Sequence, residues 1–245
     1  MFDALFTKYK RLVFFDTETT GLMPDGNDQI IELAAIAVDA DGTEYEMDDF
    51  VRLHTMDEIP PKIVELTGIM PITLSMEGVD EHEAVRHFWN IAERDERDFF
   101  KDTETLLIAH NAHFDLMFLA HAQLRCKKNH GMTMEWESFC KADYLDTLTI
   151  FRDRRRYPHK LENAIAEYGL SGKVENSHRA VDDCKALYEV AKKMEEEKAD
   201  LDKYINIFGF LKKWGPEKHP FKKVTYGAQD FDNLGNKPLY ERVGD

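Results

Sequence analysis

The stretch Arg11-Leu-Val-Phe-Phe-Asp-Thr-Glu-Thr-Thr-Gly-Leu22 decides how the rest of the chain is interpreted. An apolar run rich in β-formers ends here in an acid, which is typical of a central strand. Because side chains alternate along a strand, Asp16 and Glu18 share one face at its end. Two carboxylates beside such a strand are costly unless cations neutralise them, and Mg²⁺ prefers carboxylate oxygens. The pair therefore indicates either a metal site or two solvated acids where a strand meets a loop.

The segments that follow predict an α/β fold. Further strands are expected at 29–38, 43–53, 106–109 and 144–150, and a hairpin turn at 39–42. Helices are expected at 61–66, 79–94, 110–125, 161–168 and 177–197, the last of them capped by Ser177. This order predicts a mixed five-stranded sheet with helices on both faces.

Composition and charge exclude several classes of protein. The chain has 245 residues, of which 32 are Lys or Arg and 47 are Asp or Glu, so the formal net charge is −15. Such a balance argues against a protein that coats duplex nucleic acid by charge alone. No apolar run approaches the roughly 20 residues that span a bilayer. Three cysteines in unlike contexts and a start without a secretion signal lead us to expect a cytoplasmic protein.

A change in composition after about residue 203 predicts a domain boundary. Residues 204–245 are rich in glycine and in scattered aromatic residues, and they predict an irregular C-terminal extension, with a hairpin at 221–226. Residues 1–203 would then form the main domain.

Two more acids and a histidine complete a candidate site. Asp115 falls after a predicted strand, in the first turn of a predicted helix, where an acid also simply favours the helix dipole. In the segment 177–183, helical spacing places Asp183 on the apolar stripe and Asp182 on the solvent face. His178 is expected at the first helical position, where its ring can turn towards Asp183. Four acids and a neutral histidine would suit metal-assisted hydrolysis of a phosphodiester.

Three motifs together resemble the DEDD 3′–5′ exonucleases, in the subgroup whose third motif carries a histidine (DEDDh), which includes polymerase III epsilon-like and RNase T-like proteins. They are Phe15-Asp-Thr-Glu-Thr-Thr-Gly-Leu22, Ile108-Ala-His-Asn-Ala-His-Phe-Asp115 and His178-x-Ala-x-x-Asp183. They occur in order, with the expected strand and helix contexts, over about residues 11–195. The resemblance implies a ribonuclease H-like fold and an enzyme that hydrolyses phosphodiester bonds at a 3′ end.

The resemblance also implies roles for individual residues. Asp16, Glu18 and Asp183 would bind the tighter of two Mg²⁺ or Mn²⁺ ions, Asp115 would help to hold the second, and His178 would be the general base. Thr19, Gly21 and Leu22 would contact the 3′-terminal nucleotide. The candidate substrate-binding residues of the second motif are His110, Asn111 and Phe114, of which the first two are also expected to shape the turn that holds Asp115.

Several alternatives stay open at this point. The basic segment 151–160 would either contact phosphates or form a solvated turn. The histidines and cysteines between 110 and 140 match no compact zinc pattern, so we expect no zinc site. Single-stranded DNA is the favoured substrate, and RNA is the alternative. A binding module on the same fold, docking a DNA polymerase subunit, is the competing function. The sequence does not indicate an oligomeric state.

Overall fold

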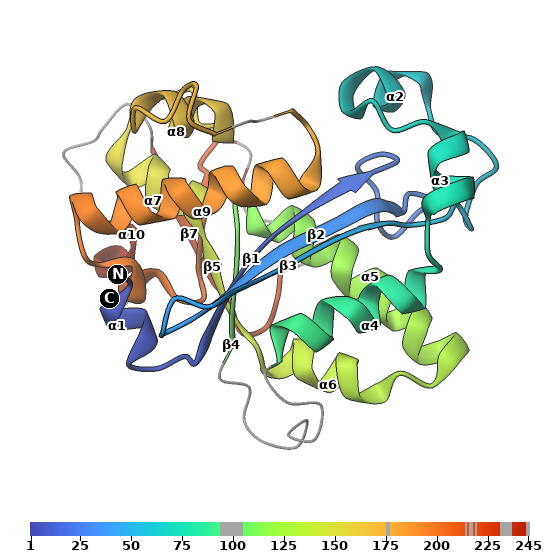
Figure 1. Cartoon of the computed structure of the whole chain (residues 1–245). Coiled ribbons are helices and arrows are strands. Elements are labelled where there is room, and N and C mark those ends of the chain that lie inside the picture. Colours follow the sequence, from blue (N-terminus) through green and yellow to red (C-terminus); the bar gives the residue numbers. More distant parts are fainter. Residues whose placement is uncertain are drawn as a thin grey trace.

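A five-stranded mixed sheet forms the centre of the molecule in the computed structural model (Figure 1). The model describes residues 1–93, 105–174, 177–213, 215, 218, 220–230 and 237–243. The strand order is β3-β2-β1-β4-β5; β2 runs antiparallel to β1 and β3, and β4 runs parallel to β1 and β5. The strands are β1 (Arg11–Thr19), β2 (Ile30–Asp39), β3 (Glu44–Phe50), β4 (Thr105–Ala109) and β5 (Asp143–Asp146). The mixed sheet expected from the sequence is confirmed.

Strand β1 is central because its side chains supply both halves of the core. Val13 and Phe15 point into one apolar cluster, and Leu12 and Phe14 point into the other. All four side chains are fully buried, as expected for a strand covered on both faces. Asp16 and Glu18, which lie on the same strand, are therefore held by a rigid part of the molecule.

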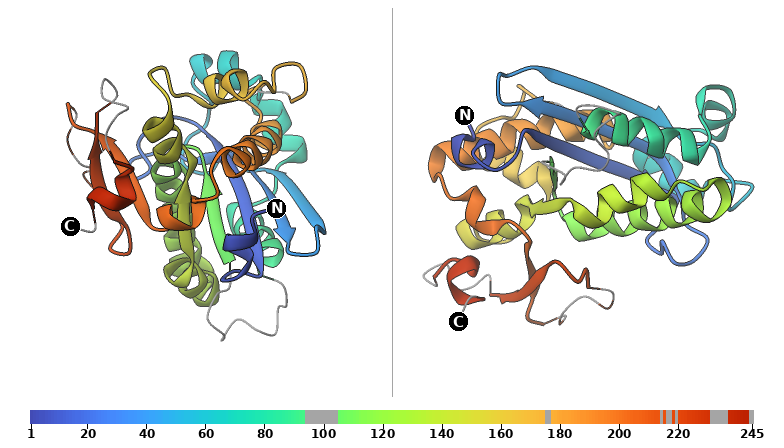
Figure 2. Two further views of the ribbon diagram at one scale, coloured as in Figure 1. Left: turned by 90° about the vertical axis from the view of Figure 1, so that its left-hand side faces the viewer. Right: turned by 90° about the horizontal axis from the view of Figure 1, so that it is seen from below.

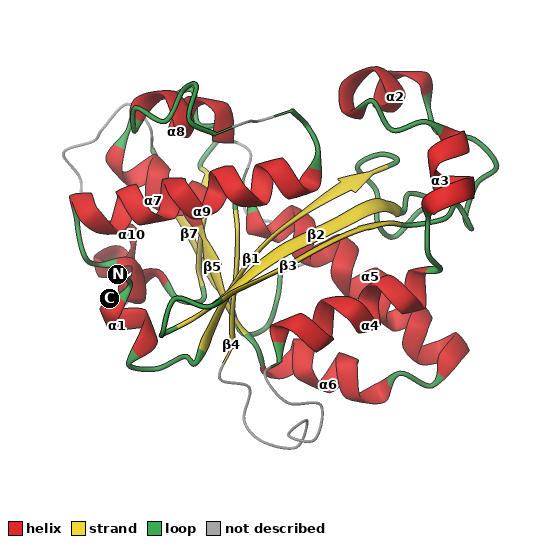
Figure 3. Ribbon diagram, in the orientation of Figure 1, coloured by secondary structure: helices red, strands yellow, loops and turns green. Residues whose placement is uncertain are grey.

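Helices cover both faces of the sheet (Figure 3). The first cluster includes side chains of α4 (Glu81–Ala92), α5 (Ala112–His130) and α6 (Thr133–Lys141). The second includes side chains of α1 (Asp3–Phe6), α7 (Thr147–Arg154), α8 (Leu161–Glu167), α9 (Ala180–Glu197) and the 3₁₀ helix η2 (Leu201–Tyr204). Two short helices, α2 (Pro61–Thr67) and α3 (Pro71–Glu77), lie beside a separate small cluster around Ile31. The sequence pattern predicts neither α3 nor α6.

Two expected elements differ from the structure. The strand expected at 144–150 ends at Asp146, because the Asp146 carboxylate accepts hydrogen bonds from the Leu148 and Thr149 amides and caps α7. Helix α9 begins at Ala180 rather than near Ser177, and Ser177 bonds to the Asp182 carboxylate at 2.6 Å instead of capping the helix. The β-branched residues of α7 make this segment look like a strand in the sequence.

The C-terminal residues form a small second sheet beside β5. Strand β6 (Ile207–Leu211) pairs in parallel with β7 (Thr225–Gln229), and α10 (Leu239–Arg242) follows. The hairpin expected at 221–226 is therefore wrong. Asn206 joins this sheet to the main one, since its amide donates to the Tyr144 carbonyl and its side chain accepts from the Tyr144 amide. Figure 2 shows these elements in red on the side of the molecule opposite to β3.

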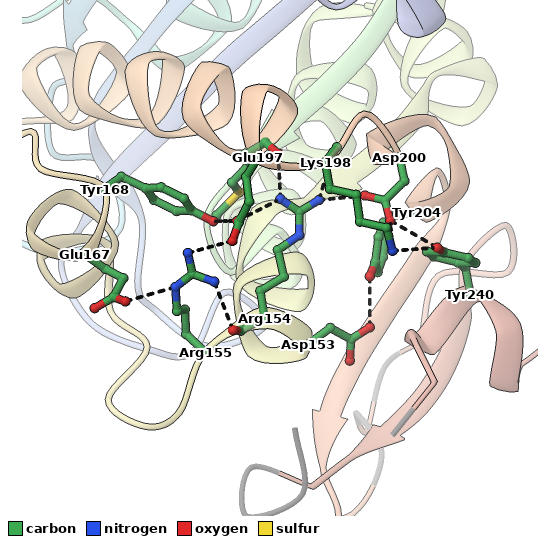
Figure 4. Close-up of polar contacts among 11 residues, drawn as sticks. Asp153, Arg154, Arg155, Glu167, Tyr168, Glu197, Lys198, Asp200, Tyr204 and Tyr240 are labelled. Atoms are coloured by element: carbon green, nitrogen blue, oxygen red, sulfur yellow. Dashed lines mark hydrogen bonds and ion pairs between the residues drawn. The ribbon is translucent and has the colours of Figure 1, made fainter. Parts of the chain in front are cut away.

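The basic segment 151–160 is largely structural. Arg154 donates to Asp200 at 2.6 Å and to the Met194 carbonyl at 2.6 Å, and Arg155 donates to Glu197 at 2.8 Å (Figure 4). These bonds satisfy the Met194 carbonyl and two carboxylates at or just beyond the C-terminal end of α9. Arg154 and Arg155 therefore join the end of α7 to the end of α9, and phosphate contact by the rest of the segment stays a prediction.

A search of the described helices for a membrane span finds none of sufficient length and hydropathy.

Candidate active site

The acids of the three motifs converge at the C-terminal half of β1. Asp16 and Glu18 lie on this strand, Asp115 in the first turn of α5 and Asp183 in the first turn of α9. The Asp115 carboxylate accepts hydrogen bonds from the Thr17 amide at 3.1 Å and from the Thr17 hydroxyl at 2.7 Å. These two bonds tie α5 to the strand, between the two acids of the first motif.

Glu18, His178 and Asp183 form a group that could hold a cation. One possible ligand atom from each side chain lies within 4.8 Å of those from the other two. Among the described residues, this is the one group of three or more such side chains that meets this distance. None of the histidines and cysteines between 110 and 140 belongs to it, and Cys126 and Cys140 are free thiols.

The electrostatics of the acid cluster disfavour its full ionisation. Burial, together with the charges of Asp183, Glu32 and Asp115, raises the pKa of Glu18 to about 8. Burial also raises the pKa of Asp115 to about 7, against the lowering effect of its bonds to Thr17. The pKa of Asp16 lies well above its usual range, through burial and then through the neighbouring carboxylates. Divalent cations would relieve this repulsion.

His178 has a backbone conformation that its neighbours must hold in place. Its φ angle is 56°, in the left-handed region, and it precedes the helix by two residues. The expectation that His178 occupies the first helical position is therefore wrong. The turn before the helix nevertheless brings its ring close to Glu18 and Asp183.

Glu32 fixes the start of α9 from the neighbouring strand. It lies opposite Glu18 in the β1–β2 pairing and is fully buried. One carboxylate oxygen accepts from Arg179 Nε at 2.8 Å and Nη2 at 2.7 Å, and the other accepts from the Ala180 amide at 3.0 Å. The sequence reasoning missed Glu32 and Arg179, although an acid inside the apolar run 29–38 was a usable signal.

The loop after β1 holds the residues expected at the 3′-terminal nucleotide. The Thr19 hydroxyl donates to the Gly21 carbonyl at 2.7 Å, and a Cβ atom on Gly21 would lie 2.4 Å from the Asp28 carboxylate. Glycine is therefore required for Asp28 to approach and bond to the Met23 amide at 2.8 Å. Leu22 is 77% exposed, which leaves it available to contact a ligand.

The second motif shapes the turn between β4 and α5. Both ring nitrogens of His110 are in hydrogen-bond contact, Nδ1 with the Thr147 hydroxyl at 3.0 Å and Nε2 with the His159 carbonyl at 2.8 Å. Burial lowers the pKa of His110, against the raising effects of its bond to the His159 carbonyl and of the Asp146 charge. Asn111 has a left-handed φ of 74°, and its amide donates to Asp146 at 2.9 Å. These contacts support the expected role of both residues in the turn.

Phe114 lies near the start of α5, and Asp146 bonds to the first turn of the same helix. The Phe114 ring packs on Phe118, with 5.0 Å between ring centroids, and is only partly buried. Asp146, which the sequence reasoning missed, also accepts from the Ala112 amide and so holds the first turn of α5. The segment Asp146-Thr-Leu-Thr149 has the pattern of a helix N-cap, but the β-branched residues around it predict a strand.

The donor set fits hard divalent cations. Carboxylates dominate, Asp115 among them is held by hydrogen bonds from the Thr17 amide and hydroxyl, and their mutual repulsion is unfavourable without a cation. A resident metal would be held by Asp16, Glu18 and Asp183, with Asp115 close by on the α5 side.

The chain is similar to known exonuclease proteins over most of its length. A family model described as "Exonuclease" matches residues 13–191. The chain is 30% identical over 193 residues to the DNA polymerase III subunit epsilon of Treponema pallidum, covering 78% of this chain and 80% of that protein. It is 33% identical over 239 residues to the PolC-type DNA polymerase III of Clostridium perfringens, covering 94% of this chain but only 14% of that protein.

A solved structure supports the fold. E. coli Exonuclease I in complex with a dA16 oligonucleotide superposes with a TM-score of 0.60 at 19% identity, over 80% of this chain and 42% of that one. The family model covers well over half of the chain, and the three motifs lie within it. The chain therefore belongs to the DEDDh-type 3′–5′ exonuclease family.

Proposed function

We propose that the chain removes nucleotides from the 3′ end of single-stranded DNA and releases nucleoside 5′-monophosphates with the help of two divalent cations. The observation that carries the proposal is the convergence of Glu18, on the buried strand β1, with Asp183 and His178, with their possible ligand atoms within 4.8 Å of one another. Asp16 and Asp115 belong to the same cluster, since the Asp115 charge raises the pKa of Asp16.

The four acids would bind the cations, and the histidine would act on the attacking water. Asp16, Glu18 and Asp183 hold the tighter Mg²⁺ or Mn²⁺ ion, and Asp115 helps to hold the second. Bound at this place, the two ions neutralise the charge of the attacking and leaving oxygens. His178 accepts the proton of the attacking water, because a neutral imidazole is a suitable base near neutral pH.

DNA is the favoured substrate, and a polymerase is the favoured partner. The relatives over most of this chain are DNA polymerase III proteins, one an epsilon subunit and one a PolC-type polymerase. Exonuclease I carries a DNA oligonucleotide in its complex. An RNA-trimming enzyme is the alternative, and it would have to accept the 2′-hydroxyl near the 3′ end. As a replication protein, the chain would act in the cytoplasm.

End-labelled substrates test the proposal. With Mg²⁺ or Mn²⁺, single-stranded DNA labelled at its 5′ end should shorten stepwise, and DNA labelled at its 3′ end should release the labelled monophosphate at once. A chelator should stop both reactions. Early mid-length fragments, degradation from the 5′ end or activity in chelator would contradict the proposal. Single-stranded RNA and duplex DNA, compared at fixed salt, decide the substrate class.

A matched pair of variants tests the acid cluster. Asp183→Asn should reduce kcat by more than about 100-fold, because it removes a charged metal ligand. Glu189→Gln is the control, since Glu189 lies on the same helix, paired with Lys192 and away from the cluster. The control should retain wild-type kcat.

A further inference from the structure

A cavity of about 470 Å³ adjoins the acid cluster. Asp16 and Asp183 line one part of it, and Phe208, Phe210, Leu211 and Tyr226 line another part. The last four residues belong to β6 and β7, which lie outside the region 13–191 that the family model matches. The extension therefore contributes a wall that the three exonuclease motifs do not predict.

This wall is fixed to the main domain by hydrogen bonds. The Gly209 amide donates to the Thr149 hydroxyl at 2.7 Å, and the Gly209 carbonyl accepts from Arg152 at 2.9 Å. The Tyr226 hydroxyl lies 3.0 Å from His113 Nδ1, in the first turn of α5. Helices α5 and α7, which anchor the wall, also carry an acid of the cluster or adjoin the turn that positions it. The wall is therefore fixed relative to the phosphodiester that would be cleaved.

The chemistry of the cavity suits an unpaired nucleotide. Its volume falls in the roughly 300–1,000 Å³ range of pockets that bury a small ligand. Phe210 and Tyr226 offer partly exposed aromatic surface, on which bases of any sequence can stack. Lys160 lines the same cavity and is 78% exposed, so it can meet a phosphate in a chain that otherwise carries net negative charge.

The position of the cavity indicates which nucleotide it would take. In the strand order, the β1–β2 loop with Gly21 and Leu22 lies on one side of β1, and the cavity lies on the other, above β4 and β5. If the 3′-terminal nucleotide occupies the loop side, as the resemblance to the family implies for Thr19, Gly21 and Leu22, the substrate strand continues towards the cavity. The leaving 3′-oxygen belongs to the nucleotide on that side.

We propose that the β6–β7 wall forms a subsite for the nucleotide that precedes the scissile phosphodiester, with its unpaired base against Phe210 and its phosphate near Lys160. This proposal rests on the proposed function. A base in a duplex is already paired and stacked, so the subsite favours single strands.

Two substrates that differ in this nucleotide test the subsite. A single-stranded DNA oligonucleotide contains it, and the p-nitrophenyl ester of thymidine 5′-monophosphate replaces it with p-nitrophenol. Phe210→Ala should raise KM for the oligonucleotide by about tenfold, within the range of one lost base–aromatic contact. The same variant should hydrolyse the ester with kcat/KM within about twofold of wild type. Equal losses on both substrates, or no loss on either, would overturn the proposal.

A substitution at the protein surface tests the same subsite through its phosphate contact, in case Phe210→Ala does not fold. Lys160→Gln should lower the slope of log KM for the oligonucleotide against log salt by about 0.7, the value of one phosphate contact to a single strand. Lys128→Gln, an exposed lysine in the last turn of α5, is the control and should leave the slope unchanged. An unchanged slope for Lys160→Gln would overturn the phosphate contact. A wild-type protein that cleaves neither substrate would instead contradict the proposed function.

Discussion

Among single residues, His178 could have either of two roles, as a general base or as a metal ligand. Its ring lies among the carboxylates of Glu18 and Asp183, where it could accept a proton from water or bind a cation itself. We propose that His178 accepts the proton from water, because the three acids Asp16, Glu18 and Asp183 already provide hard oxygen ligands for the cation. The two uses predict different behaviour of one variant.

The variant His178→Ala should separate these uses. A lost general base should reduce kcat by about 10²–10⁴-fold, while the affinity for Mn²⁺ measured by calorimetry stays within about threefold of wild type. A comparable loss of Mn²⁺ affinity would assign His178 to the metal instead.

Glu32 offers a second prediction at this scale, because it holds the backbone next to His178. Glu32→Gln should lower kcat by about tenfold with KM nearly unchanged, as is usual when a group that orients a functional residue is altered. Glutamine keeps the volume but cannot accept from both Arg179 and the Ala180 amide as a carboxylate does.

The exposed pair of Glu46 and Lys185 provides the control for Glu32. Glu46 lies on β3 and reaches the same helix at 3.1 Å, but both side chains are about half exposed, at 49%. Glu46→Gln should therefore leave kcat unchanged. A fall in kcat for Glu32→Gln no larger than the loss of folded protein seen in a melting curve would make the role of Glu32 structural only.

At the scale of elements, the contact between α7 and α9 depends on Arg154. Its guanidinium is 9% exposed and bonds to Asp200, itself 3% exposed, and to the carbonyls of Met194 and Lys198. Arg154→Ala should lower the free energy of unfolding by about 3 kcal/mol, because Lys198 would then be the one cation paired with the buried Asp200 carboxylate in the described part of the chain. Urea denaturation measures this change.

The neighbouring Arg156 is the control for this prediction. Arg156 is exposed, and Arg156→Ala should change the free energy of unfolding by less than about 0.5 kcal/mol. Equal effects of the two substitutions would show that the arginine–carboxylate network of Figure 4 does not stabilise the fold.

The elements also show where local sequence patterns stop being informative. The run 11–16 predicts β1 correctly because its burial follows from its own side chains. The run 144–150 misleads because its β-branched residues favour a strand, although Asp146 ends the strand and caps α7 through the Leu148 and Thr149 amides. The left-handed turn at His178 is different, since it lies beside contacts to Glu32, which is 146 positions earlier in the chain. No local pattern predicts a contact over that separation.

At the scale of the whole molecule, the sheet and the convergence of the acids follow from three motifs in order, but the wall of β6 and β7 does not. Strand β6 approaches β7 at Gly209, where a Cβ atom would lie 1.9 Å from Gln229 Oε1. Gln229 in turn donates to the Thr149 carbonyl at 2.8 Å. No local pattern predicts these contacts.

The acid cluster also makes the stability of the whole protein depend on pH and metal. Glu18 and Asp115 have folded-state pKa values raised to about 8 and about 7, above the roughly 4 of an unfolded carboxyl. Between these limits the folded protein binds more protons than the unfolded chain, so the contribution of the cluster to stability falls as pH rises from about 4 to 8.

In chelator, we therefore expect Asp16→Asn to melt at a higher temperature than wild type at pH 8, with a smaller difference at pH 5. With Mg²⁺ in excess the wild type should gain more than the variant, because the ion stabilises only a folded site that can bind it. Melting curves at both pH values, with and without Mg²⁺, measure the four differences. If the wild type and Asp16→Asn melted alike in chelator at pH 8, the repulsion among these carboxylates would be too weak to require a cation.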